Sequence, residues 1–121
     1  MNTTDTLLLS LSALCLCIAP PAWAHAALVD AVPGKNTELT AAPKEITLRF
    51  NESLEADFSS IQVVDAGGKS MLTKKASVDA SDLKTLRAPL DPLKSGRYTV
   101  QWVGVGHDGH RRTGDYRFVV K

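Results

Sequence analysis

The chain has 121 residues, with 14 lysines and arginines against 13 aspartates and glutamates and a formal net charge of +1. This length predicts a single globular domain. The balanced charge, without a run of five like charges, provides no cationic field that would gather nucleic acid, so we expect no nucleic-acid partner.

The first predicted element is an N-terminal signal peptide. The apolar run from Leu7 to Ile18 has the length of a signal-peptide core and is too short to span a bilayer. Ala22-Trp23-Ala24 then places alanines at the two positions that signal peptidase reads. Because residues 1–6 contain no lysine or arginine, an uncleaved N-terminal anchor is the alternative. We expect cleavage after Ala24.

Cleavage there makes residues 1–24 the signal peptide and residues 25–121 the mature domain, which begins with His25. Cys15 and Cys17 both lie in the predicted signal, so the mature domain has neither a disulfide nor a cysteine metal ligand. We expect a secreted domain without stable membrane insertion, held together by its core.

The mature domain shows an apolar period of two and no helical periodicity, which predicts an all-β fold. Seven short strands are predicted in chain order: Ala26–Val32, Glu45–Phe50, Ser60–Asp65, Ser70–Lys75, Leu83–Ala88, Arg97–Val103 and Asp115–Lys121. The second, sixth and seventh alternate most clearly, and their inward side chains are Ile46, Leu48, Phe50, Tyr98, Val100, Trp102, Tyr116, Phe118 and Val120.

Turn signals separate these strands. Glycines or prolines occur at Pro33-Gly34, Ala66-Gly67-Gly68 and Lys94-Ser95-Gly96, and the Gly67-Gly68 pair is typical of a tight hairpin. Asn51–Ser59 has many charges and few apolar residues, so a connecting loop suits it better than a helical turn. About seven strands with such turns predict a two-sheet β-sandwich of immunoglobulin-like or cupredoxin-like type.

The segment His107-Asp108-Gly109-His110 contains three candidate metal ligands in four positions. Residues two apart on an extended chain face the same side, so Asp108 and His110 are expected to act together, with Gly109 allowing the backbone to bend. His107 would face the other way, as a solvated residue or as a further ligand if the loop curls, and we leave it out of the predicted site.

The third histidine, His25, would carry a free α-amine after cleavage. An N-terminal histidine chelates through its amine and ring nitrogens, and with Asp108 and His110 it offers three nitrogens and one oxygen, a donor set that suits Cu(II). The alternative is an ordinary Asp-Gly hairpin turn with surface histidines beside it. The alternation of apolar residues does not by itself bring His25 close to Asp108 and His110.

Five short motifs follow one another along the chain: His25-Ala26-x-Leu28, Pro43 before Ile46-Thr47-Leu48-Arg49-Phe50-Asn51-Glu52, Gly96-Arg97-Tyr98-Thr99-Val100-x-Trp102, Asp108-Gly109-His110 and Tyr116-x-Phe118-x-Val120. In this combination the mature chain resembles the CopC-type family of periplasmic copper-resistance proteins. The resemblance implies a Greek-key sandwich with a Cu(II) site formed by His25, Asp108 and His110.

The resemblance also implies a function in copper homeostasis and resistance. The protein would sequester Cu(II) in the periplasm or deliver it, with an inner-membrane copper transport protein as a cooperating partner, and it would not be an enzyme and would have no catalytic residues. Many family members have a second, Cu(I) site in a methionine-rich loop. Here Met71 is the only methionine of the mature domain, so we expect no Cu(I) site.

Two alternative functions belong to other classes. A copper ion held by an N-terminal histidine resembles the histidine brace of oxidative polysaccharide-cleaving enzymes, but the few aromatic residues lie at core spacing rather than on a substrate face. A metal-free interaction module is the other alternative, because β-sandwiches serve many functions.

Overall fold

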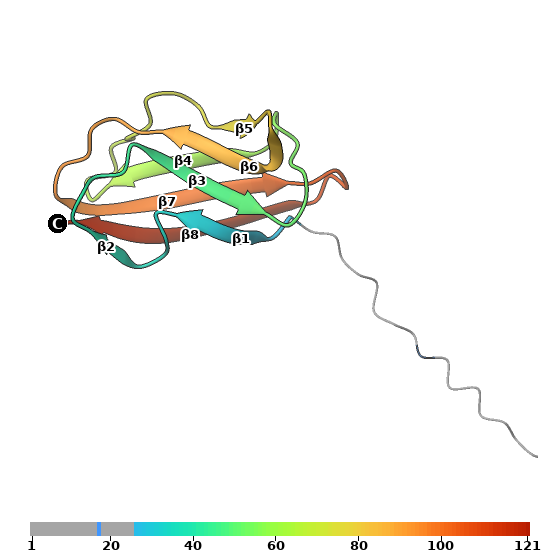
Figure 1. The fold of residues 1–121 in the computed structure, drawn as a ribbon, viewed down its shortest axis with the longest axis horizontal. Helices are drawn as coiled ribbons and strands as arrows, with labels where there is room; N and C mark the ends of the chain where they lie inside the picture. The colour runs from blue at the N-terminus through green and yellow to red at the C-terminus, as the bar shows by residue number, and fades with distance from the viewer. Residues whose placement is uncertain (1–16, 18–25) are drawn as a thin grey trace, which may run out of the picture.

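The computed structural model describes Cys17 and residues 26–121, and the latter form two packed β-sheets (Figure 1). The strands are β1 (Leu28–Val32), β2 (Thr37–Leu39), β3 (Glu45–Phe50), β4 (Ser60–Asp65), β5 (Ser77–Asp79), β6 (Asp82–Pro89), β7 (Gly96–Val105) and β8 (Arg111–Val120). One sheet has the order β1-β3-β6-β5 and the other β2-β8-β7-β4. The predicted all-β sandwich is confirmed, with eight strands instead of about seven.

The predicted signal peptide, apart from Cys17, and His25 lie outside the described residues. Within the described part of the chain, no helix is long and apolar enough to cross a bilayer.

The core between the sheets consists of the side chains that the alternating patterns predicted to point inward. All nine of these side chains are buried, and Ile46, Leu48 and Phe50 are completely inaccessible. The ring of Phe50 meets the ring of Trp102 from the opposite sheet edge to face, with centroids 5.3 Å apart. Burial of these aromatic rings supplies much of the apolar area that holds the two sheets together.

The predicted strand at Ser70–Lys75 is wrong. Ser70 forms an isolated bridge with Val64 in one sheet, and Leu72 forms another with Leu90, beside the other sheet. The segment therefore crosses from one sheet to the other and cannot continue a ladder with either. The strand that follows the crossing is β5, three residues long and paired with β6.

Strand β2 was not predicted. It has three residues and pairs parallel to the last part of β8, so it is too short for an alternating pattern to appear. Asn36, just before it, has a φ of 56° and donates its backbone N–H to the carbonyl of Arg117 over 2.8 Å.

One end of the sandwich carries the two connections that concern function. β3 ends there at Phe50 and β4 begins at Ser60, so the connecting segment Asn51–Ser59 covers this end, while β7 turns into β8 through residues 106–110. β1 also begins there, because Leu28 pairs with Phe50. The segment Asn51–Ser59 is a loop, as predicted. It contains one turn, in which the backbone carbonyl of Glu55 accepts hydrogen bonds from the N–H groups of Phe58 and Ser59.

Candidate metal centre

The turn between β7 and β8 is built by local backbone geometry. The ladder between the two strands runs up to the Val105–Arg111 pair, which leaves residues 106–110 to reverse the chain. Gly109 has a φ of 77°, which glycine adopts at little cost, and its N–H donates to the carbonyl of Gly106 over 3.0 Å. The turn thus projects beyond the sheet and exposes residues 107–110.

Within this turn Asp108 and His110 lie side by side. The backbone N–H of His110 donates to Oδ1 of Asp108 over 3.0 Å, and Nδ1 of the His110 ring lies 2.9 Å from Oδ2. These bonds close an Asx-type turn, so the two side chains meet because of the turn rather than through the extended chain we expected. In the tautomer in which Nδ1–H donates to Asp108, the lone pair of His110 lies on Nε2, ready to bind a metal ion.

His107 points elsewhere, to the segment Asn51–Ser59. Its Nδ1 lies 2.8 Å from Oε1 of Glu55, and both side chains are substantially exposed. Three further contacts join the turn to this segment: Leu54 bridges Gly106, Glu55 N–H donates to the carbonyl of Val105 over 2.7 Å, and Val105 N–H donates to the side-chain hydroxyl of Ser59. His107 therefore helps to fasten the turn to this segment.

Glu52 is a residue that our interpretation of the sequence missed. Its Oε1 atom is buried and, among the described residues, has no hydrogen-bond partner. The carboxylate occupies the space beside Gly106 that a side chain at position 106 would need. A buried carboxylate oxygen without a hydrogen-bond partner is unfavourable, and a nearby cation would offset that cost. The only signal in the sequence was its place in the Phe50-Asn51-Glu52 motif.

The start of the described chain is anchored next to Glu52. Ala26 is fully buried, and Ala27 exchanges two hydrogen bonds with Asn51, from Ala27 N–H to Oδ1 over 2.8 Å and from Asn51 N–H to the Ala27 carbonyl over 3.0 Å. His25 directly precedes Ala26 and lies outside the described residues. The structure thus brings Asp108 and His110 together and fixes the residue that follows His25 at the same end of the sandwich.

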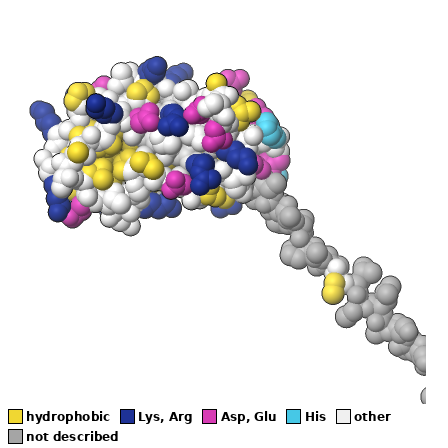
Figure 2. Space-filling view, viewed as in Figure 1, with side chains coloured by type: hydrophobic (Ala, Val, Ile, Leu, Met, Phe, Trp, Pro, Cys, Tyr) yellow, Lys and Arg dark blue, Asp and Glu magenta, His cyan; other side chains and the backbone are white. Residues whose placement is uncertain are grey.

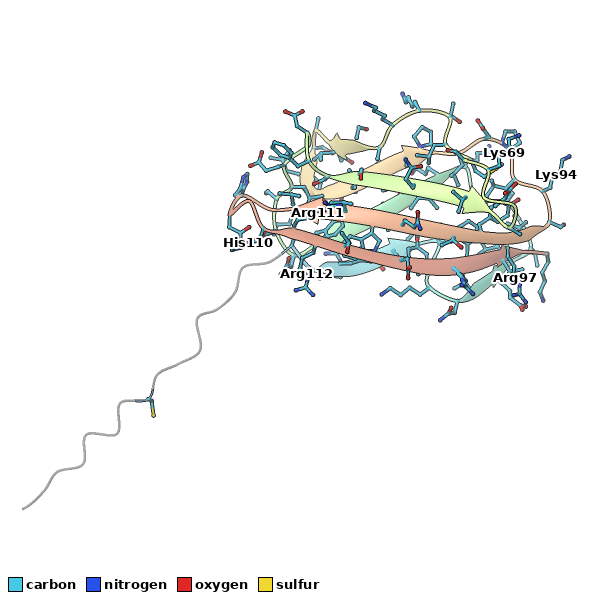
Figure 3. All side chains as sticks on the ribbon, turned by 180° about the vertical axis from the view of Figure 1, so that it is seen from behind. Lys69, Lys94, Arg97, His110, Arg111 and Arg112 are labelled. Atoms are coloured by element: carbon cyan, nitrogen blue, oxygen red, sulfur yellow. The ribbon has the colours of Figure 1, made fainter. Side chains whose placement is uncertain are left out.

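Acidic and basic side chains surround this centre. Figure 2 shows histidine beside acidic side chains at this end of the domain. Figure 3 shows Arg111 and Arg112 close to His110, whereas Lys69, Lys94 and Arg97 lie at the opposite end. Among residues 26–121, no three acidic, histidine or cysteine side chains gather closely enough to hold a metal ion by themselves. Asp108 and His110 are therefore a partial donor set.

A family model described as the CopC domain matches residues 28–121. The chain belongs to the CopC family. Protein YobA of Escherichia coli strain K12 is 42% identical over 105 residues, which are 86% of this chain and 85% of YobA. The crystal structure of PcoC, a methionine-rich copper resistance protein from Escherichia coli, matches with a TM-score of 0.71 and 34% identity, over 81% of this chain and all of PcoC. Copper transport protein CutJ of Bacillus subtilis strain 168 is 31% identical over 99 residues, which are 81% of this chain and 18% of CutJ.

CopC membership confirms the predicted family. It agrees with the predicted absence of enzyme activity, because PcoC is named as a copper resistance protein and CutJ as a copper transport protein. This CopC chain differs from the methionine-rich PcoC in composition, because its full sequence contains two methionines. Of these, Met71 packs on the edge of the core, where its N–H donates to the carbonyl of Val63 over 2.8 Å.

Proposed function

We propose that this protein binds one Cu(II) ion through the α-amine and imidazole of His25, the carboxylate of Asp108 and the imidazole of His110. The observation that carries the proposal is the Asx-type turn that holds Asp108 and His110 side by side, at the end of the sandwich where Ala26 is buried. Three nitrogens and one carboxylate oxygen suit the tetragonal geometry of Cu(II), and Cu(II) binds such donors more tightly than other divalent first-row metals.

Glu52 supports the same assignment electrostatically. Its buried Oε1 next to Gly106 adds a negative charge close to the turn, and a divalent cation there would offset the cost of burying it. Glu52 also follows Asn51, the residue that anchors Ala27, so Glu52 lies at the same end of the sandwich as Ala27 and the turn. We therefore include Glu52 as a charged neighbour of the ion.

The proposed ligand set requires removal of the signal peptide after Ala24, because only then does His25 carry a free amine. Export and cleavage would place the protein in the periplasm, where we propose that it sequesters Cu(II) or delivers it. An inner-membrane copper transport protein is the proposed partner. The match to a part of CutJ supports this, because a domain similar to this chain occurs there within a longer protein named for copper transport.

We further propose that the protein has no Cu(I) site. Thioether sulfur is the donor that Cu(I) selects, and Met71 is the only methionine in the described residues. Its half-buried position on the edge of the core offers one such donor and no histidine, because no histidine occurs between residues 26 and 106.

The proposal is tested on the full chain expressed with its signal and purified after export, with mass spectrometry to establish the first residue. Cu(II) competition titration and electron paramagnetic resonance should show one tight tetragonal site. A glycine inserted between Ala24 and His25 displaces the amine from the imidazole, and His110→Ala removes a ligand, so both should weaken binding strongly.

The matched control is His107→Ala, a histidine of the same turn that points to Glu55 instead. It should keep the wild-type spectrum. Weak copper binding that is the same in all four proteins would refute the metal site and favour the metal-free interaction module. Peroxide consumption by the copper form that depends on a polysaccharide would favour the oxidative enzyme.

A further inference from the structure

The contact between Ala27 and Asn51 has a geometry that strand pairing alone does not produce. The β1–β3 ladder ends at the Leu28–Phe50 pair, and beyond it the chain bends at Asn51. In a continuing ladder, the acceptor for an N–H on β1 would be a backbone carbonyl of β3. Here the side-chain Oδ1 of Asn51 accepts the N–H of Ala27 over 2.8 Å in its place.

Asn51 also uses its backbone on the same residue, because its own N–H donates to the carbonyl of Ala27 over 3.0 Å. Both polar backbone groups of Ala27 are therefore bound by one residue. Side-chain amides that replace a backbone partner in this way fix local chain direction where regular structure ends. The path of the chain just before β1 is thus set by Asn51.

The residues on either side of this contact belong to the proposed copper site. Ala27 is two residues after His25, and the intervening Ala26 is fully buried. On the other side, the buried Oε1 atom of Glu52 lies beside Gly106, and Leu54 bridges Gly106 at the base of the turn that carries Asp108 and His110. Asn51 therefore links the start of the mature chain to the turn.

We propose that Asn51 is the positioning residue for the N-terminal copper ligand. By fixing Ala27, it holds the α-amine and imidazole of His25 in the orientation that meets Asp108 and His110, so the chelate forms without first ordering a free chain end. A ligand that is ordered before binding gives tighter binding, because the entropy cost of ordering it does not reduce the free energy of metal binding. This inference rests on the proposed function.

The test is a double-mutant cycle on the exported, processed protein, with Cu(II) as the probe. Asn51→Ala should weaken Cu(II) binding by about 3- to 10-fold, the equivalent of one neutral hydrogen bond. Its paramagnetic resonance spectrum should show a second Cu(II) species with fewer nitrogen couplings. Asn51→Asp keeps an oxygen that accepts the Ala27 N–H, and it should restore the single wild-type species.

The same substitution is then made in the protein with a glycine inserted before His25. If Asn51 acts through the N-terminal ligand, Asn51→Ala should have no further effect there, because the amine is already lost. Thr37→Val is the matched control: it removes one side-chain hydrogen bond, from the Thr37 hydroxyl to the Gly34 carbonyl, at the far end of the sandwich. It should leave the copper affinity and spectrum unchanged.

The outcomes distinguish the positioning role of Asn51 from the proposed copper site. If the glycine insertion weakens copper binding but Asn51→Ala does not, the positioning role is wrong and the proposed function stands. An equal effect of Asn51→Ala with and without the insertion also overturns the positioning role. If the insertion leaves wild-type binding unchanged, the N-terminal ligand itself is wrong, and Asn51 has no ligand to position.

Discussion

Two turns of this sandwich share the same local hydrogen-bonding pattern but differ in their contacts with the rest of the domain. In the turn after β4, Oδ1 of Asp65 accepts the N–H of Gly67 over 2.9 Å, and Gly68 has a φ of 85°. In the turn after β7, Oδ1 of Asp108 accepts the N–H of His110 over 3.0 Å, and Gly109 has a φ of 77°. In each, an aspartate closes an Asx-type turn, and a glycine with positive φ lies within this turn or directly after it.

The two turns differ in what surrounds the aspartate. In the Asp65 turn, the side chain of Asp65 bonds to the backbone of its own turn, because the same Oδ1 atom also accepts the N–H of Lys69 over 2.9 Å. In the Asp108 turn the second oxygen, Oδ2, faces the ring of His110 at 2.9 Å. Long-range contacts then fasten this turn to the segment Asn51–Ser59, through His107 with Glu55 and Gly106 with Leu54.

The comparison shows that a turn motif predicts local shape but not function. What distinguishes the Asp108 turn is this second set of contacts, which come from a segment about 50 residues earlier in the chain and cannot be seen in a local sequence pattern. Variants of the Asp108 turn and of the residues that contact it should therefore differ in copper binding from matched variants elsewhere in the sandwich.

The largest expected effect is that of Asp108→Ala on copper affinity. It removes a proposed ligand together with the bond that orients the His110 ring, so Cu(II) binding should weaken by at least about 100-fold, since even partners of ligands contribute 10- to 100-fold. Asp65→Ala should destabilise the fold by about 1 kcal/mol and leave copper affinity unchanged. Competition titration and urea denaturation of both variants measure this, and equal copper affinities would contradict the account.

Glu52→Ala should weaken Cu(II) binding by roughly 10-fold, because it removes a negative charge next to the ion without removing a proposed ligand. The unfolding free energy of the metal-free protein should not fall, because the variant also removes a buried carboxylate oxygen that has no partner among the described residues. A large loss of stability without loss of copper affinity would instead give Glu52 a purely structural role.

Gly106→Ala should displace the Glu52 carboxylate without changing Glu52 itself. The added methyl group would overlap Glu52, whose flexible end can move away, so the carboxylate should be displaced. We expect a loss of copper affinity no larger than that of Glu52→Ala, and no additional loss when the two substitutions are combined. Gly67→Ala is the matched control in the Asp65 turn, where a methyl group would make ordinary contact. Additive effects of the two site substitutions would contradict this explanation.

A third aspartate turn, at Asp79, should affect the stability of the fold but not copper binding. The hydroxyl and N–H of Ser81, and then Arg87, lower the pKa of Asp79 from 3.8 to about 2. The ionised carboxylate therefore stabilises the fold above about pH 4, and this contribution is lost as the pH falls toward 2.

Asp79→Asn should thus be less stable than the wild type at neutral pH, and the difference in unfolding free energy should shrink between pH 4 and pH 2, with copper affinity unchanged. Urea denaturation across this range tests it. A stability difference that stays constant down to pH 2 would show that the ionisation of Asp79 is not involved.

The fold was largely predictable from the sequence where burial imposes alternation. β3 and β4 have the predicted bounds, because one face of each strand packs on the core. The prediction failed at Ser70–Lys75, where the chain crosses between the sheets, and it missed β2, whose three residues are ordered by β8. In both cases the partner in space decides the structure.

The site was predictable only in part. The pairing of Asp108 with His110 follows from their spacing, although an Asx-type turn brings them together rather than an extended strand. Glu52 was not found, because its importance comes from burial beside Gly106, a contact between residues far apart in the sequence. The participation of His25 in the site stays a prediction, since this residue lies outside the described residues.

The proposed copper site can be observed directly in a crystal structure of the processed protein loaded with Cu(II), with anomalous scattering measured at the copper absorption edge. We expect one strong peak, within coordination distance of the His25 amine and ring and of Asp108 and His110. A peak at Met71, or copper bound only at scattered surface sites while this end of the sandwich stays empty, would contradict it.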